Sequence, residues 1–279
     1  MIQSTMTLLS PMLSATLLTV ASIKAIFFID VVTAAIGITI LVVFLHVPER
    51  VGAGEAEEGE EAEEGEEAEE ASYFSDLRAG IAYIAERGFL KAFFLFNAVF
   101  FTFMGPMEFL TPLQIARRFG DEVWRLSAIE VAFSIGMLVG GLLMAYWGGF
   151  ANRLYSMALA IFIFGACTVV LGLPPRFTTY VVLTGVAGFV VPLFNTPATV
   201  MLQERVDEAY LGRIFGLHTM IASSLMPLSM LVYGPLADVI SIERLLVGTG
   251  AVLILQGVLM LVNRPLRQAG RPMLASATD

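Results

Sequence analysis

The stretch LSAIEVAFSIGMLVGGLLMAYW, residues 126–147, contains Glu130 as its only charged residue. An α-helix rises about 1.5 Å per residue, so this stretch is long enough to cross the roughly 30 Å hydrocarbon core of a bilayer. Its length and its apolar character together predict a membrane-spanning helix.

Similar stretches recur along the chain and give about eight predicted spans: 6–22, 25–46, 90–114, 126–147, 153–173, 178–201, 212–236 and 244–262. The composition agrees, because 57% of the 279 residues are hydrophobic, 15% are charged and the mean hydropathy is +0.79. A soluble domain is typically about 45–50% apolar and about 25% charged. We therefore predict an all-α, polytopic protein of the cell (inner) membrane, with the lipid bilayer as its main partner.

The formal net charge of −9 comes from one tract, EAEEGEEAEEGEEAEE at residues 55–70. A like-charged tract without aromatic residues is typical of disordered chain, which predicts a solvated linker over 48–73. Cation capture or partner docking by the tract stays open as an alternative. Outside this tract acidic and basic residues nearly balance, so the sequence gives no basis for nucleic-acid binding.

Several chemical functions have no residues to support them. The chain contains one cysteine, Cys167, and two histidines, His46 and His218. These allow no intrachain disulfide and form no cluster of metal ligands. A nucleophile–base pair and a phosphate-binding loop are also absent from the sequence pattern. We therefore expect no catalytic residues, no cofactor and no enzymatic activity.

The distribution of basic residues predicts the orientation. Ten of the 16 Lys and Arg residues fall on the side that holds the acidic tract, which places that side and both termini in the cytoplasm. The pattern of residues 74–88 predicts an amphipathic helix at the cytoplasmic surface of the membrane. Its apolar face would carry Phe74, Leu77, Ile81 and Ile84. The predicted organisation has five parts: two spans in 1–47, the linker 48–73, the interface helix 74–88, a six-helix block in 89–263 and a cytoplasmic tail in 264–279.

Three acidic residues lie inside predicted spans: Asp30, Glu108 and Glu130. A charge at the centre of a spanning helix costs about 2.5–3.5 kcal/mol, so each needs an explanation. Counted along the helices, all three lie roughly 6–9 Å below the outer surface. Because burial disfavours the charged form, a carboxyl group there can exchange protons near neutral pH or pair with a cationic substrate. The alternative is a structural hydrogen bond to a neighbouring helix, which we favour for Asp30.

Other features of the spans suggest close helix packing and a cavity. Gly136, Gly140 and Gly141 form a small-residue face. Glycines and prolines interrupt the sixth span around Asn195, and Pro227, Gly234 and Pro235 do the same in the seventh. The third span is rich in phenylalanine, and we predict that Asn97, Phe101 and Met104, together with Asn195, line a cavity for lipophilic ligands. Phenylalanines that face lipid are the alternative.

The loop GGFANRLYS, residues 148–156, resembles a signature of the major facilitator superfamily. Gly148, Asn152 and Arg153 match its G-x-x-x-D-R pattern, with Asn in place of the usual Asp. Three further segments, 126–141, 195–218 and 233–250, resemble helices eight and ten to twelve of macrolide-efflux-like exporters. Asp76, Gly80 and Tyr83 resemble the element before helix seven. The resemblance covers nearly all of the chain except the glutamate tract.

This resemblance implies that residues 6–46 correspond to helices five and six, and 90–262 to helices seven to twelve, of a twelve-helix transporter. Glu108 and Glu130 would then lie on cavity-side helices and Asp30 on a supporting helix. The residues of the implied cytoplasmic gate are Gly148, Asn152, Arg153, Gln203, Arg205 and Arg213. Arg153 would pair there with a carboxylate or a helix end, and Asn152 would weaken charge pairing because it is neutral.

The predicted function is a proton-coupled exporter (antiporter) of amphipathic or lipophilic small molecules, of the drug-resistance type, present as a C-terminal fragment or a truncated form. The substrate cavity of such transporters lies between two six-helix halves. The alternative is therefore a non-transporting membrane protein or half-transporter that needs a separately encoded N-terminal partner.

Overall fold

A computed structural model of the chain describes residues 32–33, 77–120, 122–173 and 176–271. Val32 and Thr33 are helical and belong to a unit separate from the one that carries the later helices. The first two predicted spans, apart from these two residues, and the acidic linker lie outside the described residues. Asp30 and Asp76 lie outside them too.

Six long helices make up the larger unit: α4 (Gly88–Phe119), α5 (Val123–Trp147), α6 (Arg153–Gly172), α7 (Phe177–Arg205), α8 (Glu208–Val239) and α9 (Ile242–Val262). Within the described residues these are the helices long and apolar enough to cross a membrane, and none of those residues forms a strand. The prediction of an all-α, polytopic membrane protein is confirmed, and each of the last six predicted spans is a helix.

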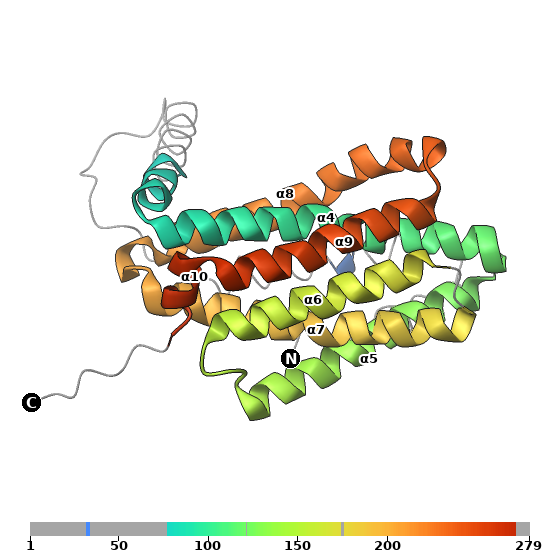
Figure 1. The fold of residues 1–279 in the computed structure, drawn as a ribbon, viewed down its shortest axis with the longest axis horizontal. Coiled ribbons are helices and arrows are strands. Elements are labelled where there is room, and N and C mark those ends of the chain that lie inside the picture. Colours follow the sequence, from blue (N-terminus) through green and yellow to red (C-terminus); the bar gives the residue numbers. More distant parts are fainter. Residues whose placement is uncertain (1–31, 34–76, 121, 174–175, 272–279) are drawn as a thin grey trace, which may run out of the picture. The chain divides into compact units, whose positions relative to one another are not determined.

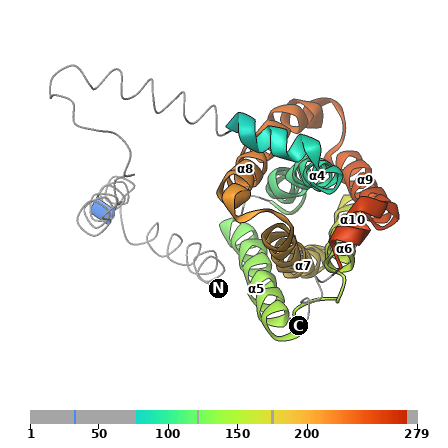
Figure 2. The same cartoon turned by 90° about the vertical axis from the view of Figure 1, so that its left-hand side faces the viewer.

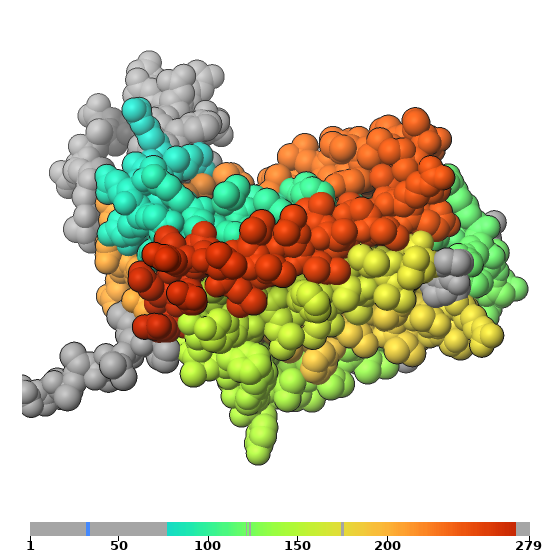
Figure 3. Space-filling view, viewed as in Figure 1, coloured from blue at the N-terminus to red at the C-terminus, as the bar shows by residue number. Residues whose placement is uncertain are grey.

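The helices pack side by side as a bundle. Neighbours in contact run in the order α5, α7, α6, α9, α4 and α8, which the end-on view shows (Figure 2). The side view shows their long axes running in the same general direction (Figure 1). On the face shown in Figure 3, α9 lies between α4 and α6. Its outward side chains are apolar and exposed, as expected for a surface in contact with lipid: Leu255, Val258, Leu259 and Val262.

Glycine allows α5 and α7 to approach closely. A Cβ atom at Gly136, Gly140 or Gly188 would collide with a backbone carbonyl of the opposite helix, so a side chain there would force the helices apart. Gly141 was predicted to share this face, but that prediction is wrong. A Cβ atom at Gly141 would meet nothing within 4 Å. Only two glycines of the predicted trio therefore lie at the interface.

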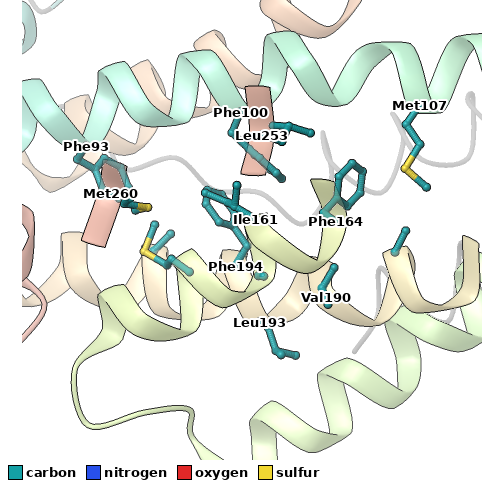
Figure 4. Packing of buried hydrophobic residues seen from close by; sticks show 14 of the residues in the cluster. Phe93, Phe100, Met107, Ile161, Phe164, Val190, Leu193, Phe194, Leu253 and Met260 are labelled. Atoms are coloured by element: carbon teal, nitrogen blue, oxygen red, sulfur yellow. The ribbon is translucent and has the colours of Figure 1, made fainter. Parts of the chain in front are cut away.

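Aromatic side chains fill the centre of the bundle. Phe100 of α4 lies against Phe194 of α7, with ring centroids 4.4 Å apart, and against Phe164 of α6, at 5.9 Å (Figure 4). Phe93 and Phe94 are also buried in this core. Much of the phenylalanine-rich span is therefore packed core, because three neighbouring helices contribute apolar side chains that fill the space around it.

We predicted that glycines and prolines interrupt the sixth and seventh spans. This prediction is wrong, because the helical backbone continues through both. Pro192 and Pro197 lie inside α7, and Pro227 and Pro235 lie inside α8, yet both helices continue through them. A proline removes one helical hydrogen bond without ending a helix that neighbouring helices hold in place.

Two elements flank the bundle at the end where α6 begins. The helix over 77–86 buries Tyr83 and Gly80, whereas Ile81, which we placed on its apolar face, is 51% exposed. The segment predicted as a tail forms the short helix α10 (Arg264–Ala269), which packs against α4 and α9. Asn263 begins α10 by accepting a hydrogen bond from the Leu266 N–H at 3.1 Å.

Candidate functional site

A cavity of about 160 Å³ lies between α4 and α5, and side chains of α6 and α7 complete its wall. Glu108 and Glu130, the two acids that the sequence placed in neighbouring spans, both line it. Most of the wall is apolar: Met104, Met107, Ile115, Leu126, Ile129, Phe133 and Phe164. The structure thus brings two of the three predicted acids into one apolar cavity.

Local sequence explains the position of Glu108. Pro112 lies one turn later in α4 and has no N–H to donate to the Glu108 carbonyl. The hydroxyl of Thr111 donates instead to the carbonyl of Met107, so side chains take part in the hydrogen bonding of this turn. The turn of α4 that lacks this backbone hydrogen bond therefore carries the acid that lines the cavity.

The charge of this cavity is unbalanced. Glu108 and Glu130 line the same cavity, so two negative charges would share it when both carboxyl groups are ionised. The described lining contains no Lys or Arg, and neither acid forms a salt bridge with a described residue. Two carboxylates without a cation favour the uptake of protons or of a positively charged group.

A hydroxyl group adds a third polar function to the cavity. Thr184 of α7 is only 6% exposed and lines the cavity, and its Oγ1 has no hydrogen-bond partner among the described residues. Buried polar atoms are nearly always paired, so this oxygen is suited to a ligand or to water. Thr184 was not predicted from the sequence, because the hydroxyl of a threonine in a span normally bonds to a carbonyl of its own helix.

The residues predicted to line a ligand cavity lie in different places. Met104 lines the acidic cavity. Asn97 is fully buried: its Nδ2 donates to the Phe93 carbonyl at 2.9 Å, which leaves its Oδ1 to accept from His218 Nε2 at 3.2 Å. Phe101 packs against the same histidine, with ring centroids 6.0 Å apart. Asn195 is exposed and lies outside the lining of this cavity.

The loop that resembles the G-x-x-x-D-R signature connects α5 to α6. Gly148 ends α5 in the left-handed conformation, with φ 72°, which favours glycine. Asn152 begins α6 by accepting from the Leu154 N–H at 3.1 Å. The other side of its amide donates to the Arg267 carbonyl of α10 at 3.0 Å, which an aspartate carboxylate cannot do.

Arg153 forms an ion pair with Glu204 at this end of the bundle. Its Nε donates to Glu204 Oε2 at 3.0 Å, and its second guanidinium nitrogen contacts Glu204 Oε1, which makes a two-point contact. Its backbone N–H also donates to the Gly270 carbonyl at 2.9 Å. Glu204 was missed although it stands between Gln203 and Arg205. The signal was available, because the loop arginine needed a carboxylate partner.

The other residues of the predicted gate lie around the same point. Arg205 donates to the carbonyls of Ala269 and Arg271, at 3.0 and 2.8 Å, and so binds the end of α10. Gln203 is exposed. The guanidinium of Arg213 lies 5.5 Å from the centre of the Tyr210 ring. Asn152, Arg153 and Arg205 thus all contact the chain segment that follows α9.

A stack of rings and guanidinium groups fixes the helix over 77–86 to the turn between α7 and α8. The Tyr83 ring lies between the Arg87 guanidinium, 3.5 Å from its centre, and the Tyr210 ring, 4.3 Å away. The Tyr83 hydroxyl donates to Asp207 at 2.9 Å and accepts from the Asp207 N–H at 3.0 Å. Arg87 also pairs with Asp207, at 2.8 Å. The sequence singled out Tyr83 only through the resemblance.

Comparison with known proteins gives consistent results. The model of the Major Facilitator Superfamily matches residues 1–230. Macrolide efflux protein A of Streptococcus pyogenes is 28% identical over 255 residues, which is 91% of this chain and 60% of that protein. Macrolide efflux protein A of Enterococcus faecalis is 29% identical over 231 residues, 82% of this chain and 68% of that protein.

A third relative is the Multidrug efflux pump Tap of Mycolicibacterium fortuitum. It is 27% identical over 168 residues, 58% of this chain and 40% of the pump. No solved structure matches the chain. The chain spans about 60% of the length of the Streptococcus pyogenes relative.

Proposed function

The chain belongs to the major facilitator superfamily, and from its acidic cavity we propose that it acts in proton-coupled efflux of amphipathic or lipophilic cations. The efflux relatives support the class of process. The observation that carries the proposal is the pair Glu108 and Glu130 in one apolar cavity without a described basic residue.

The mechanism follows from the charge of the cavity. With both carboxyl groups ionised, the cavity attracts a protonated amine, and the apolar wall contacts the carbon atoms around it. Protons that enter from outside neutralise the carboxyl groups, which removes the attraction and lets the substrate leave. Substrate and protons therefore compete for the same two groups, and this competition couples their movements.

The size of the cavity limits what it can hold. An engineered cavity of about 150 Å³ takes up one benzene molecule, so about 160 Å³ is enough for one substituent of a large molecule. A macrolide would place its amine-bearing substituent there and leave its ring system outside. Met104 and Met107 suit substituents of different shape because their side chains are flexible.

The end of the bundle at Arg153 is proposed as the cytoplasmic gate. The pair between Arg153 and Glu204 ties α6 to α7, and Arg205 ties α7 to the end of α10. In the proposed cycle the Arg153–Glu204 pair forms in one conformation and opens in another. For Asp30 we still expect, from the sequence, a structural role.

Efflux from cells tests the proposal. The full chain is expressed in cells that lack their own macrolide exporters, and accumulation of a radiolabelled macrolide is measured with and without a protonophore. We expect lower accumulation with the wild-type chain, and loss of this effect with Glu130→Gln and with the double variant E108Q/E130Q.

Asp238→Asn is the matched control, because Asp238 is an exposed acid near the end of α8 and lies outside the cavity. It should export as the wild type does. Export by E108Q/E130Q at the wild-type rate, with both proteins present in the membrane at equal amounts, would contradict the proposal.

A further inference from the structure

A second cavity, of about 330 Å³, lies where α4 ends and α9 begins. This is the end of the bundle opposite the Arg153 loop, because Gln114 there contacts the Leu171 carbonyl near the end of α6. The cavity shares no lining residue with the acidic cavity. Its lining consists of Gln114, Arg117, Arg118, Ser241, Ile242 and Glu243.

Two arginines supply the positive charge of this cavity. Arg117 and Arg118 stand in the last turn of α4, and both are exposed. Neither forms a salt bridge with a residue in the described ranges. Two neighbouring guanidinium groups without a described carboxylate partner form a strong binding site for a phosphate group, which they can hold through several charge-assisted hydrogen bonds.

Two residues that line the same cavity carry hydrogen-bond acceptors. Gln114 is 2% exposed; its Nε2 donates to the Leu171 carbonyl at 3.4 Å, and its Oε1 has no partner among the described residues. A buried acceptor without a partner indicates that a hydrogen-bond donor belongs there. The carboxylate of Glu243, in the first turn of α9, adds a second acceptor. The ligand must therefore combine an anion with a donor.

We infer that this cavity binds a phospholipid headgroup in which a phosphate is joined to a hydrogen-bond donor, either an ammonium or a hydroxyl group. The phosphate contacts Arg117 and Arg118, and the donor contacts Glu243 and Gln114 Oε1. The position fits a lipid, because helix ends lie at the polar boundary of the bilayer. Exposed apolar side chains on either side, Leu113 (39%) and Val239 (85%), offer contact to the acyl chains.

The need for a hydrogen-bond donor predicts that the cavity distinguishes between lipid headgroups. A choline headgroup carries the same phosphate, but its quaternary ammonium has no N–H to donate. We expect phosphatidylethanolamine, phosphatidylglycerol or both to bind at least about tenfold more tightly than phosphatidylcholine, because phosphatidylcholine cannot form the charge-assisted hydrogen bond to Glu243.

Native mass spectrometry of the full chain measures this preference. The purified protein in detergent receives an equal mixture of the three lipids with identical acyl chains, and retained lipid is counted. Preference for phosphatidylethanolamine alone assigns the donor to an ammonium group, and preference for phosphatidylglycerol alone assigns it to a hydroxyl group. Equal retention of phosphatidylcholine overturns the inference.

Variants locate the site. R117Q/R118Q should lower retention of the preferred lipid to the level of phosphatidylcholine, and R117K/R118K, which keeps both charges but loses the planar fork, should give an intermediate level. The control R264Q/R267Q changes an exposed arginine pair at the other end of the bundle and should change nothing. Unchanged retention in R117Q/R118Q, or an equal loss in the control, overturns the inference.

A soluble probe distinguishes a lipid from a free phosphate ester. Glycerophosphoethanolamine carries the same phosphate and ammonium group without acyl chains, so we expect it to bind much more weakly than the lipid. If it binds the full chain as tightly as the intact lipid, the site belongs to a soluble phosphate ester and the lipid assignment is wrong.

Discussion

Asn152 shows how one side chain departs from a family signature for a structural reason. The signature has aspartate at this place, and an aspartate would also begin α6 well. Here the amide accepts from Leu154 N–H and donates to the Arg267 carbonyl, so one side chain both begins α6 and binds α10. The resemblance also implied that Arg153 pairs with a carboxylate or a helix end, and Glu204 is the carboxylate that it contacts. Weaker charge pairing at this loop, expected because Asn152 is neutral, stays a prediction.

Substitution of Asn152 separates its two roles. Asn152→Asp keeps the acceptor for α6 and loses the donor to α10, whereas Asn152→Ala loses both. A lost helix cap costs about 1 kcal/mol and a lost hydrogen bond costs a similar amount. Thermal unfolding of the purified chain should therefore rank wild type first, Asn152→Asp second and Asn152→Ala last. Equal unfolding temperatures for the two variants would show that α10 does not depend on the amide donor.

Residues of the site were predictable to different degrees. Glu108 and Glu130 stand out in the sequence because a charge inside an apolar span is costly. Thr184 and Gln114 do not stand out, since polar uncharged side chains are common in spans and only the surrounding helices show that their oxygens lack described partners. Asn97 was placed in a cavity, and its buried contact with His218 depends on how α4 meets α8.

At the scale of helices, the sequence predicted where the spans run and less well how they face one another. Apolar length alone locates α4 to α9, because every span must satisfy its backbone hydrogen bonds internally. Which side of a helix faces the bundle depends on the neighbouring helices. Gly140 contacts α7 and the adjacent Gly141 does not, although both belong to one run of glycines. Ile81 is exposed for a similar reason, because Tyr83 and Gly80 provide the inner face of the helix over 77–86.

Two adjacent glycines test the packing of α5 against α7. Gly140→Ala adds a methyl group that would collide with the Phe189 carbonyl, and such overpacking typically costs about 1–3 kcal/mol. Gly141→Ala adds the same group in open space and should leave stability unchanged or slightly higher, because alanine favours helix. Unfolding in a denaturing detergent titration measures both variants. Equal destabilisation by the two substitutions would contradict the observed contact.

The docking of the helix over 77–86 should depend on pH. Burial raises the pKa of Tyr83, although the hydrogen bond from the Asp207 N–H and the charge of Arg87 oppose this, so the neutral hydroxyl is the form that the fold stabilises. For a group whose pKa is raised by folding, the stabilisation is complete below the unfolded pKa, about 10 for tyrosine, and is lost as the pH rises through the folded pKa.

A spin label attached at Glu86→Cys reports this docking by electron paramagnetic resonance. The label should stay immobile up to about pH 10 and become mobile above it. Tyr83→Phe cannot ionise and also lacks both hydroxyl bonds, so its label should be more mobile at neutral pH and insensitive to alkaline pH. If the mobility of the label in the wild type were the same at all pH values, the role of Tyr83 would be contradicted.

At the scale of the whole molecule, the six described spans form a bundle that carries three chemically different features. The ion pair of Arg153 and the bonds to α10 lie at one end, the arginine-lined cavity lies at the other, and the acidic cavity lies between α4 and α5. The fold class could be predicted from the lengths of the apolar stretches, and the family from short motifs such as the loop at 148–153. Glu108 and Glu130 were expected on cavity-side helices only through the resemblance, and the apolar side chains and Thr184 that surround them depend on contacts between helices distant in the chain.

The central claim is that Glu108 and Glu130 exchange protons for a cationic substrate. The most direct test is to add a macrolide to the purified full chain in weakly buffered solution at neutral pH and to record proton release with a pH-sensitive dye. We predict that the wild type and Asp238→Asn release protons as they bind the macrolide, and that E108Q/E130Q, folded as judged by thermal unfolding, releases none. Binding to the wild type without proton release, or equal release by E108Q/E130Q, would contradict the account.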